Sequence, residues 1–582
     1  MADDAQRDAP WWTRSTVYQV YPRSFMDSDG DGIGDLGGVL QRVDHLADLG
    51  VDVLWLSPVY RSPQDDNGYD ISDYHDVDPV FGTLEQLDEL IEQLHARGIR
   101  LLMDLVVNHT SDEHPWFTES RSSPSSPKRD WYWWRPPREG MAAGAPGAEP
   151  TNWESFFSGP AWELDEASGE YYLHLFSRKQ PDLNWENPEV RHAVYAMMRW
   201  WLDRGVDGFR MDVINLISKR VGPDGRLHDG PVADGSRYGD RSGETVCGPR
   251  IHEFLAEMHR EVFEGRRAFD GGPLLTVGEM PGVTVEEARL FTDPARREVD
   301  MVFQFEHVGL DHGPAGKFDP RPVDLRDLKA TFGRWQAGLA DVGWNSLYWD
   351  NHDQPRAVSR FGDDSEEHRR DSATCLATLL HLHRGTPYVY QGEEIGMANV
   401  PFQRLLDLRD LESLRWANEQ EAAGRDVADL LPGLRAHSRD NARTPVQWDA
   451  TPQAGFTAGE PWIEVNPDHV RWNVEAQRDD EGSVLAHHRR LIGLRKDLDV
   501  VALGDFEMLL PEHEQVYAFR RTLPGADPAA VLVVCNVGGS AVDLGELLPE
   551  AVGLPLVLGS LGEPQQAAVL RPWEARVLRT DA

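Results

Sequence analysis

The chain has few cysteines and no long hydrophobic run. Cys247, Cys375 and Cys535 are its three cysteines, and their spacing fits neither a metal site nor a disulfide framework, which favours a reducing compartment. No segment approaches the roughly 20 consecutive apolar residues of a membrane-spanning helix. Residues 1–10 lack the basic-then-apolar pattern of a secretion signal. These absences predict a cytoplasmic protein that has no membrane partner.

Positive charge is also scarce. Asp and Glu number 98 against 58 Lys and Arg, so the formal net charge is -40. Phosphate backbones are bound by clustered basic residues, and we therefore expect no nucleic-acid partner. A dispersed acidic surface is usually only solvated and indicates no specific protein partner. We therefore expect either a monomer or a small homo-oligomer.

Buried strands alternate with helices along much of the chain. Strands are predicted at 15–21, 51–56, 99–107, 206–213, 274–279, 300–306, 346–350 and 387–391. Eight strands with crossover helices predict an α/β fold, a (β/α)8 TIM barrel, formed by 1–109 and 182–505. Residues 110–181, rich in Pro, Ser, Gly and Trp, are an inserted subdomain after strand 3. Residues 506–582 show short strands without long helices, which indicates a C-terminal antiparallel β-sandwich domain.

Charged residues interrupt the apolar strand at 206–213. Arg210 and Asp212 are two residues apart and therefore share one face of the strand. Taken alone, Asp212 could simply cap the next element while Arg210 neutralises it. Glu279 and Asp353 occupy comparable strand ends, however, and the carboxyl ends of barrel strands share one face of the barrel. The convergence of three carboxylates favours glycoside hydrolysis, in which one attacks, one donates a proton and one stabilises positive charge.

A Gly-rich loop with alternating aspartates follows the first strand. Its segment 32–37 matches G-x-G-x-x-G, but the turn lies about ten residues beyond the strand, and the aspartates would repel a pyrophosphate. The aspartates at 27, 29, 31 and 35 suit a hard cation such as Ca²⁺ or Mg²⁺. The alternative is a turn whose aspartates bond only to backbone amides.

Several stretches resemble the signature motifs of the family 13 glycoside hydrolases, the α-amylase family. They are Asp-Leu-Val-Val-Asn-His (104–109), Gly-Phe-Arg-Met-Asp (208–212), Val-Gly-Glu (277–279), Asn-His-Asp-Gln-Pro (351–355) and Gln-Pro-Asp-Leu-Asn (180–184). Asp-Asn-Ala-Arg-Thr-Pro (440–445) is typical of the α-glucosidase branch. The resemblance covers nearly the whole chain. It implies a retaining, exo-acting α-glucosidase that needs no organic cofactor.

The resemblance also implies a role for individual residues. Asp212 would be the nucleophile, Glu279 the acid/base and Asp353 the stabiliser of the transition state. The implied substrate-binding residues are Asp66, Tyr69, His109, Phe157, Phe176, Gln180, Arg210, Val213, His352 and Arg443. The implied ligands of a structural Ca²⁺, or Mg²⁺ in its place, are Asp27, Asp29, Asp31, Asp35 and the carbonyl of Ile33.

The residue after the implied nucleophile narrows the substrate. Val213 is similar to the valine of oligo-1,6-glucosidases, whereas maltose-preferring relatives carry a smaller or hydroxyl-bearing residue. A β-branched side chain would crowd an α-1,4-linked second sugar, which favours short α-1,6-linked isomalto-oligosaccharides as small α-glucoside substrates. Trehalose-6-phosphate hydrolases share Asp-Val-Ile-Asn at 212–215 and are the alternative, together with α-glucosidases acting on maltose or sucrose. A non-catalytic transporter partner of similar fold is disfavoured, because all three carboxylates are present.

Overall fold

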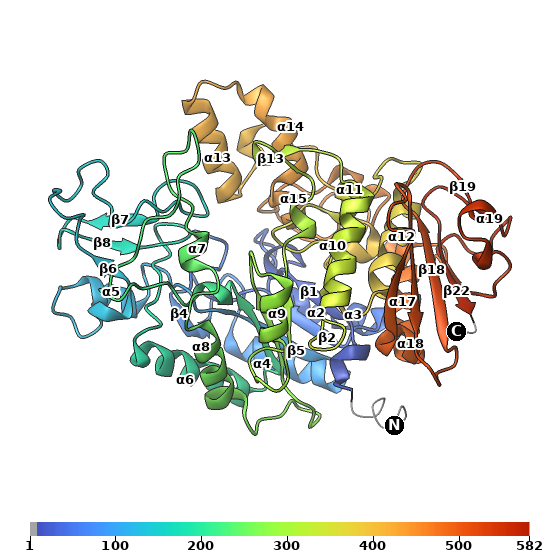
Figure 1. The fold of residues 1–582 in the computed structure, drawn as a ribbon, viewed down its shortest axis with the longest axis horizontal. Coiled ribbons are helices and arrows are strands. Elements are labelled where there is room, and N and C mark those ends of the chain that lie inside the picture. Colours follow the sequence, from blue (N-terminus) through green and yellow to red (C-terminus); the bar gives the residue numbers. More distant parts are fainter. Residues whose placement is uncertain (1–8, 581–582) are drawn as a thin grey trace.

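A closed barrel of eight parallel strands is the centre of the computed structural model, which describes residues 9–580 (Figure 1). The strands are β1 (Val17–Val20), β2 (Val53–Leu56), β5 (Arg100–Val106), β9 (Gly208–Asp212), β10 (Leu275–Glu279), β11 (Met301–Phe303), β14 (Ser346–Leu347) and β15 (Thr386–Tyr390). They pair in the order β11-β10-β9-β5-β2-β1-β15-β14. A parallel bridge between Val302 and Asn345 joins the two end strands. This confirms the predicted TIM barrel.

Helices cover the outside of the barrel. The main ones are α2 (Leu36–Gln41), α3 (Val43–Leu49), α4 (Leu84–Ala96), α6 (Pro188–Arg204), α8 (Ile251–Met258), α9 (Val285–Phe291), α10 (Leu325–Gly338), α12 (Arg369–Leu382) and α17 (Val484–Asp497). Short helices are α7 (Ser242–Thr245), α11 (Ala357–Arg360), α16 (Val474–Gln477) and α18 (Asp499–Leu503). Local sequence sets their ends: α4 begins with a capping box between Thr83 and Gln86, and α6 ends at left-handed Gly205.

Side chains of the barrel strands alternate between its interior and its helix-covered face. On β9, Phe209 and Met211 join the outer core, whereas the Arg210 guanidinium lies over the Trp55 ring in the interior. This alternation follows from the two-residue period of a strand. It brings Arg210 and Asp212 to one side, as the sequence predicts.

Two groups of elements extend the loops at one end of the barrel. The first contains the hairpin β3 (Tyr60–Arg61) and β4 (Asp73–Val77), helix α5 (Pro115–Arg121), and the antiparallel sheet of β6 (Trp134–Arg135), β8 (Glu170–Leu173) and β7 (Trp162–Asp165). A bridge between His109 and Asp182 closes the base of the inserted segment. The second contains β12 (His312–Gly313), β13 (Gly316–Pro320), α13 (Leu411–Ala422), α14 (Val427–His437) and α15 (Asp440–Arg443). Figure 1 shows α13 and α14 above the barrel, with β6–β8 to one side.

An antiparallel sheet ends the chain. Its strands are β16 (Asp505–Leu509), β17 (Val516–Thr522), β18 (Ala530–Asn536), β22 (Ala575–Thr580) and β20 (Leu556–Gly559), in that spatial order. One face packs on the barrel helices, and the other packs on α19 (Leu544–Leu547) and the pair β19 (Val542–Asp543) and β21 (Val569–Leu570). The antiparallel C-terminal domain is therefore confirmed.

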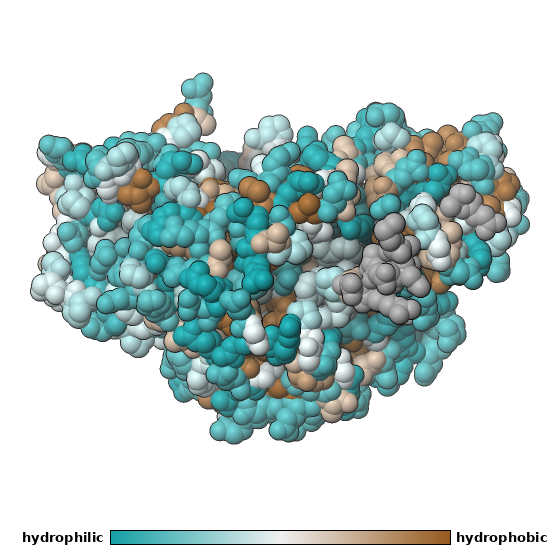
Figure 2. Space-filling view, turned by 60° about the horizontal axis from the view of Figure 1, so that its bottom comes forward, coloured by the Kyte–Doolittle hydropathy of each residue, from teal (hydrophilic) through white to brown (hydrophobic). Residues whose placement is uncertain are grey.

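The outer surface is polar. Figure 2 shows a mostly hydrophilic face on which hydrophobic residues lie in small, separate groups. Within residues 9–580, no helix is both long and apolar enough to cross a lipid bilayer.

Arg521 joins the C-terminal sheet to the barrel. Its guanidinium is fully buried and donates to the carbonyls of Leu382, at 2.6 Å, and Gly504, at 2.7 Å. We predict that Arg521→Leu lowers the free energy of unfolding by about 3 kcal/mol, because both carbonyls lose a charged donor inside the protein. The melting temperature should fall while KM stays unchanged.

The neighbouring residue supplies a matched control. Arg520 pairs with Glu507 at the surface, and 31% of its side chain is exposed. Arg520→Leu should therefore shift the melting temperature little. Equal losses in the two variants would contradict this account of Arg521.

Candidate active site

A pocket of about 200 Å³ lies where β9 and β10 end. Its predicted members are Asp66, Tyr69, His109, Phe157, Phe176, Asp212, Val213, Glu279 and Asp353. The remaining lining residues are Phe156, Pro281, Phe305, Lys317, Gln354, Glu412 and Arg439. The strand ends thus bring together three carboxylates that are far apart in the sequence.

Arg210 organises one wall of this pocket. Its Nη1 lies 2.7 Å from Asp212 Oδ1 and 2.7 Å from Asp104 Oδ1, and its Nη2 lies 2.7 Å from Glu279 Oε2. Burial raises the pKa of Asp212 above its ordinary value, although the Arg210 guanidinium opposes the shift. Burial also raises the pKa of Asp104 to about 6. Because three carboxylates share one guanidinium, the cluster of carboxylates as a whole retains a proton more readily than three separate carboxylates would.

Val213 links the two carboxylates through its backbone. Its φ of 35° and ψ of 39° are left-handed, a strained conformation for a β-branched residue. In this conformation the Val213 N–H donates to Glu279 Oε2 at 3.1 Å. The side chain of Val213 lines the pocket directly beside Asp212. Backbone strain therefore occurs at the turn that places both groups.

Asp353 is surrounded by cationic and imidazole groups. Arg443 donates to its Oδ1 at 2.7 Å, Arg439 donates to the same oxygen at 3.3 Å, and His352 Nε2 lies 3.5 Å from Oδ2. Burial raises the pKa of Asp353, but His352, Arg439 and Arg443 outweigh it and hold the pKa well below its usual range. Asp353 is therefore ionised and can stabilise a positive charge in the pocket.

Hydrogen-bonding groups cluster around Asp66. Gln180 Nε2 donates to Asp66 Oδ2 at 3.1 Å and lies 3.2 Å from His109 Nε2. The rings of Tyr69 and His352 stack, with their centroids 5.1 Å apart. These groups suit a molecule with several hydroxyls and one apolar ring face. Gln180, Arg210, His352 and Arg443 thus lie behind the lining and hold it in place.

Two residues of the pocket, Lys317 and Glu412, could not be predicted from the sequence. Lys317 comes from β13 and Glu412 from α13, and they pair at 2.7 Å across the pocket rim. Neither residue lies at the end of a barrel strand or within one of the family motifs. Arg439 could have been found, because it lies one helical turn before Arg443. Asp104 could also have been found, because it begins the motif at 104–109. Its side chain points into the barrel, where it accepts from Arg210.

The predicted metal loop brings part of its ligand set together. Carboxylate oxygens of Asp27, Asp29 and Asp35 lie within 4.8 Å of one another. Asp31 is outside this group, and its Oδ1 accepts from the Ile33 N–H at 2.8 Å. Asp27 also accepts from the N–H groups of Gly30 and Gly32. Three converging hard oxygens fit a Ca²⁺ or Mg²⁺ ion.

Comparison with known proteins assigns the family. Residues 19–504 match the family model described as "Alpha amylase, catalytic domain". The chain belongs to the alpha-amylase family. It is therefore a glycoside hydrolase, and the resemblance inferred from the motifs is confirmed.

Full-length relatives agree with this assignment. The chain is 53% identical to an oligo-1,6-glucosidase of Parageobacillus thermoglucosidasius, with 98% of this chain and 99% of the relative covered. It is 46% identical to a trehalose-6-phosphate hydrolase of Bacillus subtilis, with 98% of each covered. The crystal structure of Bacillus licheniformis trehalose-6-phosphate hydrolase superimposes with a TM-score of 0.88 at 43% identity, covering 98% of this chain and 99% of that one.

Asp66 gives a testable pH dependence. Burial raises its pKa to about 7 in the fold, against about 3.9 in an unfolded chain. A raised pKa contributes stability that is present below about pH 4 and is lost as the pH rises through 7. The Asp66→Asn variant does not titrate at this position, so it does not lose this stability as the pH rises. Its stability relative to the native protein should therefore increase by about 2.6 kcal/mol between pH 5 and pH 8.

Denaturant melts of both proteins at the two pH values measure this difference. A difference that is independent of pH would show that Asp66 titrates normally. The control is Asp65→Asn, which removes the neighbouring carboxylate. Gln64→Glu is unsuitable because it adds a charge.

Proposed function

We propose that this protein is an exo-acting, retaining α-glucosidase that releases the nonreducing-end glucose of short α-1,6-linked isomalto-oligosaccharides. The observation that carries the proposal is the pair of carboxylates, Asp212 and Glu279, held 2.7 Å from one buried guanidinium at a pocket wall. Two carboxylates that contact the same guanidinium lie side by side on one wall, as a nucleophile and an acid/base must in a covalent mechanism. The similarity to the oligo-1,6-glucosidases supports the choice of linkage.

The proposed reaction has two steps. Asp212 Oδ attacks the anomeric carbon while Glu279 gives its proton to the glycosidic oxygen, so the bond to the leaving sugar breaks and a glucosyl ester forms. Glu279 then takes a proton from water, and the water oxygen displaces Asp212 and releases glucose with its original configuration. Ionised Asp353 stabilises the positive charge that develops on the sugar ring in both steps.

The size of the pocket supports exo action. Its volume of about 200 Å³ is below the about 300–1,000 Å³ that is typical of sites for larger ligands. One terminal sugar can be enclosed, and the rest of the substrate must extend past Val213 and the Lys317–Glu412 pair. The β-branched side chain of Val213 beside the nucleophile favours the more flexible α-1,6 linkage.

The charge of the pocket argues against a phosphorylated substrate. Five of its lining residues are carboxylates, namely Asp66, Asp212, Glu279, Asp353 and Glu412. Its two cations, Lys317 and Arg439, are already paired with Glu412 and with Asp353 and Asp410. A phosphate would meet no free cation among these lining residues. Trehalose 6-phosphate remains the second candidate because of the hydrolases similar to this chain.

Initial rates on isomaltose, maltose, sucrose and trehalose 6-phosphate, measured at equal concentration, test the proposal. We expect isomaltose to be hydrolysed fastest. Asp212→Asn should lose about 10⁴-fold or more of kcat on every substrate, because the nucleophile is removed. A highest rate with trehalose 6-phosphate would move the assignment to the second candidate.

Val213→Ala separates linkage preference from catalysis. Alanine lacks the two methyl groups that would crowd an α-1,4-linked second sugar, and a side chain without a β-branch adopts the left-handed turn with less strain. We expect the ratio of isomaltose to maltose hydrolysis to fall while the hydrolysis of an activated aryl glucoside changes little. An unchanged ratio would show that Val213 does not set the linkage.

We also propose that Asp27, Asp29 and Asp35, with Asp31 and the Ile33 carbonyl, hold a structural Ca²⁺, or Mg²⁺ in its place. The supporting observation is the convergence of three carboxylates in a tight loop. Removal of the ion with a chelator should lower the melting temperature, and added Ca²⁺ should restore it. Asp29→Ala, at an exposed position, should abolish both responses. A melting temperature that neither the chelator nor added Ca²⁺ changes would contradict the proposal.

A cytoplasmic location is proposed on the state of the cysteines. All three thiols are free, and Cys375 and Cys535 are buried. Unpaired thiols are typical of proteins kept in a reducing compartment.

A further inference from the structure

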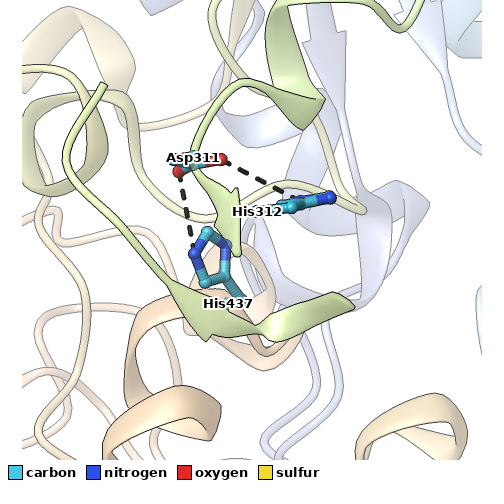
Figure 3. Close-up of side chains that lie close together, drawn as sticks. All are labelled: Asp311, His312 and His437. Atoms are coloured by element: carbon cyan, nitrogen blue, oxygen red, sulfur yellow. Dashed lines mark ion pairs between the residues drawn. The ribbon is translucent and has the colours of Figure 1, made fainter. Parts of the chain in front are cut away.

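Two histidines face one carboxylate beside the rim of the pocket. His312 Nε2 lies 3.9 Å from Asp311 Oδ1, and His437 Nε2 lies 3.7 Å from Asp311 Oδ2. The ligand atoms of the three residues lie within 4.8 Å of one another. Figure 3 shows the two rings approaching the Asp311 carboxylate from different directions. Asp311 and His437 are buried, with 4% and 2% of their surface exposed.

These contacts are not ordinary hydrogen bonds. Both separations exceed the about 2.7–3.2 Å expected of an N–H···O bond. Within the described part of the chain, the other ring nitrogen of buried His437, Nδ1, has no hydrogen-bond partner either. No hydrogen bond of this ring therefore competes with a ligand bound at Nε2, the nitrogen that faces Asp311. A tetrahedral metal with bonds of about 2.0–2.1 Å would hold its ligand atoms roughly 3.4 Å apart, a few tenths of an ångström less than the two histidine–Asp311 separations.

We propose that Asp311, His312 and His437 form a binding site for a divalent transition-metal ion of the Zn²⁺ class. Two imidazoles and one carboxylate are a donor set that suits Zn²⁺, Co²⁺ or Ni²⁺ and disfavours Ca²⁺, which takes oxygen ligands. The site is separate from the aspartate loop at 27–35. Water would complete the coordination on the side of His312, whose side chain is 31% exposed.

Arg360 limits the affinity of this site. Its Nε and Nη2 donate to the two oxygens of Asp311, each at 2.7 Å. Each carboxylate oxygen has a second lone pair, which leaves room for a metal bond to Asp311. The guanidinium repels a nearby cation, however, and we therefore expect micromolar rather than nanomolar binding.

The position of the site gives the ion a structural effect. Asp311 and His312 begin the β12–β13 hairpin that carries Lys317, whereas His437 ends α14, two residues before Arg439. An ion would therefore join the hairpin that supplies Lys317 to the end of α14, which lies two residues before the lining residue Arg439. Its binding to the folded protein should raise the melting temperature.

Titration of the native protein with Co²⁺ in the presence of excess Ca²⁺ tests the proposal. Ca²⁺ occupies hard oxygen sites, so the visible absorption of Co²⁺ and its calorimetric stoichiometry report histidine coordination. We expect one ion per chain and a rise in melting temperature. His437→Gln and His312→Gln should each weaken binding by about 100-fold or more and remove the rise.

A matched control is available at the surface. His75 lies 3.9 Å from Asp73, the same separation as in the His312–Asp311 pair, but its side chain is 51% exposed. His75→Gln should leave Co²⁺ binding unchanged. The proposal fails if the native protein binds no Co²⁺ at micromolar concentration, or if binding survives both substitutions. Comparing each variant with and without metal separates the loss of the site from a loss of stability.

Discussion

The charge of Arg210 is the interaction on which the candidate site depends. One fully buried guanidinium pairs with Asp104, Asp212 and Glu279, each at 2.7 Å. Without it, three carboxylates would lie together inside the barrel, and removing one partner of a buried charge pair costs about 3–5 kcal/mol. The barrel strands supply Arg210, Asp104, Asp212 and Glu279 from their inward faces. Rigid strands thus fix the geometry that flexible loops could not.

Two charge environments divide the proposed chemistry. Around Arg210, three carboxylates share one cation, and burial raises the pKa of Asp212 and of Asp104. Around Asp353, by contrast, Arg439 and Arg443 both contact its carboxylate and hold its pKa well below the usual range. Enzymes assign the roles of acid and stabiliser by such differences in environment. The strained backbone of Val213 lies between the two carboxylates of the first group and joins them through its N–H.

Strand periodicity accounts for most of what the sequence could predict. The alternation of Phe209, Arg210, Met211 and Asp212 set the inward face of β9, and the count of strands set the barrel. Lys317, Glu412, Asp311 and His437 were not predictable in this way. They lie on short strands and helices whose approach to the pocket depends on tertiary packing, and polar sequences such as that of α13 show little periodicity.

The most direct test of the central claim is to trap the glycosyl-enzyme. A fluorinated α-glucosyl fluoride forms the covalent intermediate of a retaining enzyme faster than the intermediate hydrolyses, and peptide mass spectrometry locates the sugar. The account predicts one fluoroglucosyl group on the peptide that contains Asp212. A label on Glu279 or Asp353, or release of a product with inverted configuration and no label, would contradict it.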